Sequence, residues 1–109
     1  MELNNLDILN IVINAKHQYL MDNVYIKNNT NYAVGMCYYI EKEISKYTNE
    51  YVSYNNIKKY IPEFIPETFN IKESDIIGYW WIPSNKKDRI KAFDKLIEIY
   101  KNKINEKTQ

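Results

Sequence analysis

The chain has 109 residues, of which 45% are hydrophobic, and its 15 basic and 14 acidic residues leave a net charge of +1. This length suits one domain that buries its own core, and it leaves no room for a second domain. The near-zero net charge argues against binding to nucleic-acid polymers, because tracking a phosphate backbone needs several cations along one face. Any anion-binding site must therefore be local.

The cysteine usage and the hydropathy pattern predict the compartment. Cys37 is the single cysteine, so no intramolecular disulfide is possible. No charged start followed by an apolar run of the export type opens the chain. Its apolar runs are also far shorter than the ~20 residues that span a bilayer. The sequence predicts a cytoplasmic protein that does not cross a membrane.

Residues 5 to 21 are predicted to form the first helix. Polar side chains recur there at steps of three and four, at Asp7, Asn10, Asn14 and His17, which is helical spacing with a narrow polar stripe. A helix that is apolar around most of its circumference is either the central helix of the domain or has one face against another subunit. From this pattern we expect a homo-oligomer.

A second helix is predicted to follow the turn at residues 28–31 and to run to about Tyr47, with Thr30 or Asn31 as its cap. Gly35 does not lie on the inward side of this helix. A glycine in the middle of a helix is either simply tolerated or marks the close approach of another element or a ligand. The inward seam of this helix consists of Ala33, Cys37, Ile40, Ile44 and Tyr47.

Ser53 is expected to cap a short helix through Tyr60, after which Pro62 and Pro66 prevent regular helix. The segment YIPEFIPETFNI is thus an irregular connection, followed by residues 76–82, which form either a helical turn or one extended strand. The side chains that attach the connection to the core are Ile61, Phe64, Ile65 and Phe69.

The last helix is predicted to begin after Asn85, which together with Asp88 resembles a capping box. We expect the ends of the chain, residues 1–4 and 105–109, to fray. The inward stripe of this helix consists of Ile90, Phe93, Ile97, Tyr100 and Ile104. The prediction is a mainly all-α fold: a single domain, residues 1–109, built as a compact bundle of three main helices plus one or two short helices, with an irregular Pro-containing connection.

Signatures of catalysis and metal binding are weak. His17 lies on the polar stripe, and no sequence signature ties it to a serine or to Cys37. One cysteine and one histidine do not make a zinc site. Glu41 and Glu43 are two residues apart on a helix, so we interpret them as solvated surface. We predict no catalytic residue, no metal and no cofactor; an enzyme assembled from distant carboxylates is the alternative left open.

The stretch GYWWIPSNKKDR, residues 78–89, combines adjacent aromatic rings with cations. Three neighbouring side chains cannot all point into one core, so part of this ring surface should face outward. The start of the last helix adds free backbone N–H groups and the positive end of the helix dipole. The predicted ligand-binding residues are Tyr79, Trp80, Trp81, Lys86, Lys87 and Arg89.

Two interpretations of this cluster compete. In the structural one, a tryptophan closes the core and Arg89, the only arginine, pairs with a carboxylate such as Glu63 or Glu67. In the functional one, an aromatic face stacks on a base while Lys87 or Arg89 binds phosphate. The planar guanidinium suits phosphate and carboxylate equally, so both interpretations stay open.

The triplet Gly35-Met36-Cys37, the segment Tyr79-Trp80-Trp81, Pro83 and Arg89 form a pattern. It resembles small, mostly uncharacterised phage-encoded proteins, in which a Gly-Leu-Cys-like triplet and a Tyr-Trp-aromatic-Pro segment precede an arginine-led terminal helix. This chain has Met36 in the middle of the triplet and Ile82 inserted before the proline. The resemblance implies a phage accessory protein, of a kind that often blocks a host defence, and it implies no substrate or active site.

The expected function is that of a non-enzymatic phage-type accessory protein of the host cytoplasm. The favoured hypothesis is that the cluster of residues 79–89 sequesters a small nucleotide-like anionic signal. The alternative is a protein–protein inhibitor of a host defence effector, comparable to an anti-CRISPR protein, that uses its tyrosine-rich surface.

Overall fold

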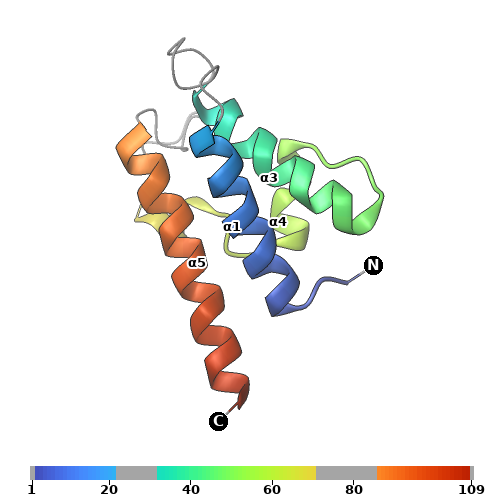
Figure 1. The fold of residues 1–109 in the computed structure, drawn as a ribbon, viewed down its shortest axis with the longest axis vertical. Coiled ribbons are helices and arrows are strands. Elements are labelled where there is room, and N and C mark those ends of the chain that lie inside the picture. The colour runs from blue at the N-terminus through green and yellow to red at the C-terminus, as the bar shows by residue number, and fades with distance from the viewer. Residues whose placement is uncertain (1, 22–31, 71–85, 109) are drawn as a thin grey trace.

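The computed structural model describes residues 2–21, 32–70 and 86–108, and within these segments all regular structure is helical. Three long helices form the body of the molecule (Figure 1). They are α1 (Asn5–Met21), α3 (Tyr32–Thr48) and α5 (Lys86–Thr108). Short elements lie between α3 and α5: the 3-10 helix η1 (Tyr54–Asn56), the helix α4 (Ile57–Tyr60) and the 3-10 helix η2 (Pro66–Phe69). The predicted helical bundle is confirmed.

Helix α1 begins at a reciprocal cap. The Asp7 backbone N–H donates to Oδ1 of Asn4 at 2.7 Å, and the Asn4 N–H donates to Oδ2 of Asp7 at 3.2 Å. Each side chain thereby satisfies an N–H group that the first turn leaves without a helical partner. The predicted limits of this helix are confirmed, and the Asn4–Asp7 cap is an addition that we did not predict.

Three residues of the predicted seam of α3, Cys37, Ile40 and Ile44, lie in the core, and Tyr47 is half-buried. The side chain of Ala33 lies outside the described ones. The helix ends at Thr48, and the next residue, Asn49, has a φ of 58° and donates its N–H to the Ser45 carbonyl at 2.8 Å. A residue in the left-handed region just after a helix is a common way to end it. The predicted caps at residues 30 and 31 lie outside the described residues.

The connection after α3 is irregular, as the two prolines predict. The short helix predicted between Ser53 and Tyr60 is divided into η1 and α4. The Ser53 carbonyl accepts a hydrogen bond from the Asn56 N–H at 2.9 Å. Ile61 and Phe64 are buried, while Ile65 and Phe69 are half-buried. Apolar side chains therefore hold this connection on the core.

Helix α5 starts at Lys86 and buries Phe93, Leu96 and Tyr100. It continues to Thr108, so residues 105–108, for which we predicted fraying, are helical in the structure. The predicted cap at Asn85 and the segment 76–82 lie outside the described residues.

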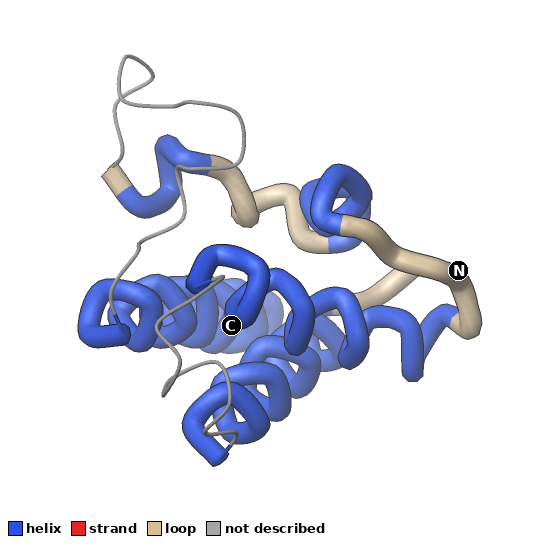
Figure 2. Tube along the Cα trace, turned by 90° about the horizontal axis from the view of Figure 1, so that it is seen from above, coloured by secondary structure: helices blue, strands red, loops and turns tan. Residues whose placement is uncertain are grey.

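The elements form a bundle with one covered side. Figure 2 shows the long helices lying together and the short helices and loops forming a second layer on one side of them. In Figure 1 this layer lies behind α1, whereas the front of α1 faces the viewer. The core draws on all parts of this arrangement: Ile8, Ile11, Val12, Ala15, Tyr19, Met36, Cys37, Tyr39, Ile40, Ile44, Val52, Ile57, Ile61, Phe64, Ala92, Phe93, Leu96 and Tyr100.

Helices α1 and α5 run antiparallel side by side (Figure 1). An ion pair between Lys16 Nζ and Asp94 Oδ1, 2.5 Å apart, joins them midway. Among the described helices, none has the length and apolar character needed to pass through a membrane.

Candidate functional site

The structure covers part of the predicted ligand site. Tyr79, Trp80 and Trp81 lie outside the described residues. Lys86 is the first residue of α5, and Lys87 beside it is exposed. Arg89, in contrast, has only 2% of its surface exposed. The cation best suited to phosphate therefore lies inside the protein.

The buried Arg89 side chain joins α5 to α1. Its Nε donates a hydrogen bond to the Tyr19 hydroxyl at 2.8 Å, and its Cζ lies 5.5 Å from the centre of the Tyr19 ring. The same ring packs against Phe93 of α5 and Tyr39 of α3, with centroid separations of 5.7 and 6.4 Å. A buried charge is tolerated only when hydrogen bonds replace its hydration. Arg89 thus has a structural contact, as one of the two interpretations expects, but its partner is Tyr19, which neither interpretation named.

Glu63, one of the two acids considered as a partner for Arg89, lies in a different cluster. It accepts hydrogen bonds from the Tyr100 hydroxyl and from Lys103 Nζ, both on α5. Burial raises the pKa of Glu63, but the hydrogen bonds from Lys103 and Tyr100 outweigh burial and leave that pKa below its usual value. Burial, followed by the hydrogen bond to Glu63, raises the pKa of Tyr100. The carboxylate is held ionised and attaches the connection to α5.

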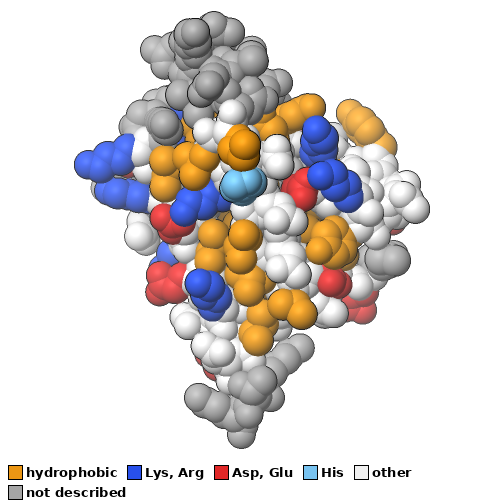
Figure 3. Space-filling model, viewed as in Figure 1, with side chains coloured by type: hydrophobic (Ala, Val, Ile, Leu, Met, Phe, Trp, Pro, Cys, Tyr) orange, Lys and Arg blue, Asp and Glu red, His pale blue; other side chains and the backbone are white. Residues whose placement is uncertain are grey.

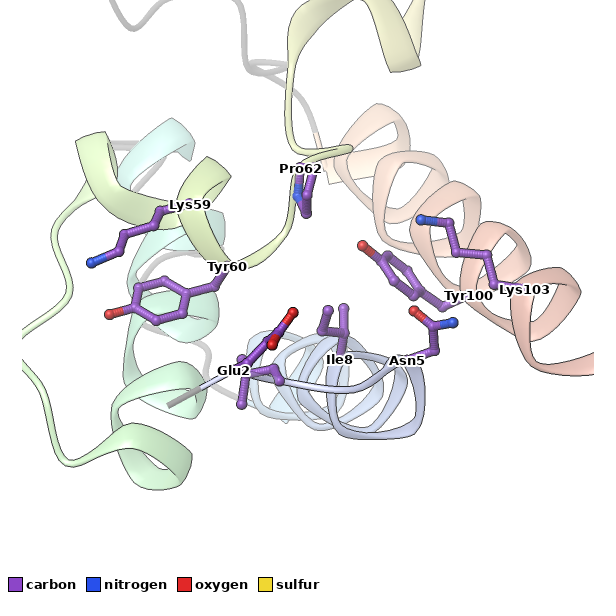
Figure 4. Close-up of a pocket in the computed structure, with 9 residues that line it drawn as sticks. Glu2, Asn5, Ile8, Lys59, Tyr60, Pro62, Tyr100 and Lys103 are labelled. Carbon is purple, nitrogen blue, oxygen red and sulfur yellow. The ribbon is translucent and has the colours of Figure 1, made fainter. Parts of the chain in front are cut away.

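A pocket of about 450 Å³ opens beside this cluster (Figure 4). In Figure 4 the Glu2 carboxylate points into the pocket, whereas the Lys59 amino group points away from it. Lys103 is neutralised by Glu63. Cations do not converge on the pocket, so its charges do not favour an anionic ligand. Its walls are Glu2, Leu3, Asn5, Ile8, Lys59, Tyr60, Pro62, Tyr100 and Lys103.

The remaining candidates for chemistry are unsuited to it. Burial raises the pKa of the Cys37 thiol far above its usual value, which disfavours the reactive thiolate. His17 is exposed. Glu43 corrects our interpretation, because it is buried rather than solvated, with Lys46 Nζ 2.7 Å from its Oε2. Across the described segments, no three His, Cys, Asp or Glu side chains are grouped so as to hold a metal ion.

An apolar row lies on the outer side of α1. Leu6, Ile13 and Leu20 are 56%, 39% and 40% exposed. They are spaced seven residues apart, so they share one side of the helix. Helix α1 is thus apolar on its solvent side as well as on its buried side, as its sequence pattern predicts.

A matching row lies on α5, where Ile90, Ile97 and Ile104 are half-buried and also seven residues apart. The two rows are in register. Lys16 and Asp94 lie opposite each other in the ion pair, and the two helices are antiparallel. Ile13, three residues before Lys16, therefore lies opposite Ile97, three residues after Asp94. The same count sets Leu6 beside Ile104 and Leu20 beside Ile90. We call these six residues the α1–α5 face. Figure 3 shows hydrophobic side chains gathered in a broken band over these two helices.

Comparison of the chain with family models, with curated proteins and with solved structures finds no match. The function has to be inferred from the geometry of the chain itself.

Proposed function

We propose that this chain is a non-enzymatic binding protein whose α1–α5 face binds another polypeptide. The exposure of Leu6, Ile13 and Leu20 in one row is the observation that carries the proposal. Single exposed hydrophobic residues are ordinary on protein surfaces, whereas several gathered on one side of a helix are typical of interaction sites. Two parallel rows with seven-residue spacing suit a helical partner, whose own apolar side chains fit between them.

The alternative that we ranked first from the sequence, capture of a nucleotide-like anion, stays a prediction. Its aromatic residues lie outside the described ones, and the Arg89 guanidinium is directed at Tyr19 in the core. Protein binding is the hypothesis that the exposed side chains support better. The phage resemblance adds a setting to the proposal, an accessory protein that inhibits a host defence effector in the host cytoplasm.

The test uses two variants that differ by one position. Ile13→Glu places a charge in the α1–α5 face, whereas Asn14→Glu places the same charge on an exposed neighbour that points to another side of α1. Proteins retained by the wild-type chain are identified, purified and titrated back. We expect Ile13→Glu to weaken the measured affinity at least about tenfold, as loss of a central interface residue does, and Asn14→Glu to leave it unchanged.

Equal affinity for all three chains would show that the partner binds elsewhere. A parallel titration with cyclic nucleotides separates the two hypotheses, since a nucleotide-binding protein gains melting temperature with its ligand. A rise in melting temperature that Lys87→Ala removes would restore the nucleotide hypothesis.

A further inference from the structure

We propose that the α1–α5 face binds a second copy of the chain, related by a two-fold axis that crosses α1 at Ile13. The inference rests on the proposed function, because it names the partner of the same face. It follows from two properties of that face, its symmetry and its charges.

The apolar rows of the α1–α5 face are symmetric about their middle. Leu6 and Leu20 lie at equal distances on either side of Ile13, as Ile90 and Ile104 do about Ile97. A two-fold interface must be complementary to itself, because each residue meets the partner's copy of the residue related to it by the axis. Here the axis places Leu6 against Leu20 of the partner subunit and Ile13 against Ile13 of the partner subunit.

The charges beside the rows select the antiparallel arrangement. Asp94 and Lys101 lie on the same flank of α5, seven residues apart and on opposite sides of Ile97. Within its own chain, Asp94 holds Lys16 Nζ at 2.5 Å through Oδ1. Antiparallel copies bring Lys101 of the partner subunit close to the same carboxylate, an attractive contact that occurs twice. Parallel copies, related by an axis along α1, would place the two α5 helices on opposite sides of the α1 pair, so Asp94 and Lys101 would not meet across the interface and this attraction would be lost.

The length of the face is adequate for this contact. Leu6 and Leu20 are about 21 Å apart along α1, given the rise of an α-helix. In the antiparallel pair, half-buried isoleucines of α5 border the contact between the two α1 helices. The second copy thereby removes from water the apolar side chains that the short elements behind α1 leave uncovered.

Disulfide trapping tests the geometry. Ile13→Cys puts two thiols at the axis, so mild oxidation of this variant should yield a covalent dimer. Leu6→Cys should not dimerise alone but should cross-link to Leu20→Cys when the two variants are mixed, because only thiols brought within about 7 Å between Cα atoms can bond. Wild type is the control, since its Cys37 is buried. Covalent dimers of Leu6→Cys with itself would indicate parallel copies and overturn the proposal.

Light scattering during size exclusion tests the assembly without introduced cysteines. We expect wild type to elute as a dimer and Lys101→Glu, which sets a carboxylate opposite Asp94 of the partner subunit, to dissociate at least about tenfold more readily. Lys95→Glu makes the same change of charge on an exposed position of α5 away from the face and should match wild type.

A wild-type chain that stays monomeric at millimolar concentration overturns the second copy as partner. The proposed function survives that result if Ile13→Glu still weakens the binding of a different purified protein. It fails as well if Ile13→Glu changes neither the oligomeric state nor any such binding.

Discussion

Arg89 is a residue whose role the sequence leaves open between core packing and ligand binding. Its guanidinium lies in the core against Tyr19, whose ring also contacts Phe93 and Tyr39. One hydrogen bond thus lies where the three long helices meet. Because this cation is buried, the stability of the fold should be sensitive to loss of the Tyr19 hydroxyl that accepts its hydrogen bond.

Tyr19→Phe removes that hydroxyl and keeps the ring. We expect the free energy of unfolding to fall by about 1–3 kcal/mol, because a buried charged donor loses an acceptor. Urea denaturation measures the loss. Tyr51→Phe is the matched control, since Tyr51 is 88% exposed and should change stability little. Equal losses in the two variants would show that the Arg89 contact contributes nothing.

Glu63 should make stability depend on pH in the acid range. Its pKa in the folded protein lies below the ordinary value of 4.5, so the ionised form is favoured by folding. Its contribution is therefore present above pH 4.5 and is lost as the pH falls through the lower, folded value. Glu63→Gln should flatten the fall in melting temperature within this window, while Glu98→Gln, at an exposed position, should not. A profile for Glu63→Gln that parallels wild type would contradict the assignment.

At the scale of elements, helix ends are decided by short polar signals. The Asn4–Asp7 cap starts α1, and Asn49 in the left-handed region ends α3. Asparagine is one of the few residues that adopt this conformation at low cost. These signals act over three or four residues, whereas the limits of α1 were predicted from the helical spacing of its polar residues.

Asn4→Ala removes the α1 cap. We expect it to lower the free energy of unfolding by about 1 kcal/mol, since the first turn loses a side-chain acceptor. Asn14→Ala makes the same substitution at an exposed interior position of α1 and should stabilise slightly, because alanine favours helix. Chemical denaturation of both variants measures the difference. An unchanged midpoint for Asn4→Ala would mean that the cap does not stabilise the helix.

For the whole molecule, the central question is what covers the α1–α5 face. The connection after α3 packs behind α1, so the core is closed on that side (Figure 2). Leu6, Ile13 and Leu20 of α1 remain in water in the single chain, and the second copy that we propose would cover them with matching symmetry.

Dimerisation should couple stability to concentration. The melting temperature of wild type should rise as the protein concentration increases, because association binds only the folded chain. Ile13→Glu should melt at a temperature independent of concentration. Differential scanning calorimetry across a hundredfold range of concentration makes the comparison, and parallel behaviour of the two proteins would argue against the dimer.

The sequence alone determined the long helices and the irregular connection. Helical periodicity is a local property, so the polar stripe of α1, the seam from Cys37 to Ile44 and the prolines at 62 and 66 carried that information. The predicted inward stripe of α5 is only partly correct, because Phe93 and Tyr100 are buried while Ile90, Ile97 and Ile104 are half-buried. The candidate site was harder to predict. Lys87 is exposed as a ligand-binding residue requires, whereas Arg89 is buried and Glu43 is not at the surface.

Tertiary structure decided the contacts between distant residues. Arg89 and Tyr19 are 70 positions apart, and nothing in the spacing of either helix indicates that they meet. The register of the α1–α5 face likewise depends on the Lys16–Asp94 pair between two separate helices. Periodicity tells which side of a helix is apolar, but only packing selects which apolar sides are joined in the core and which one remains in water.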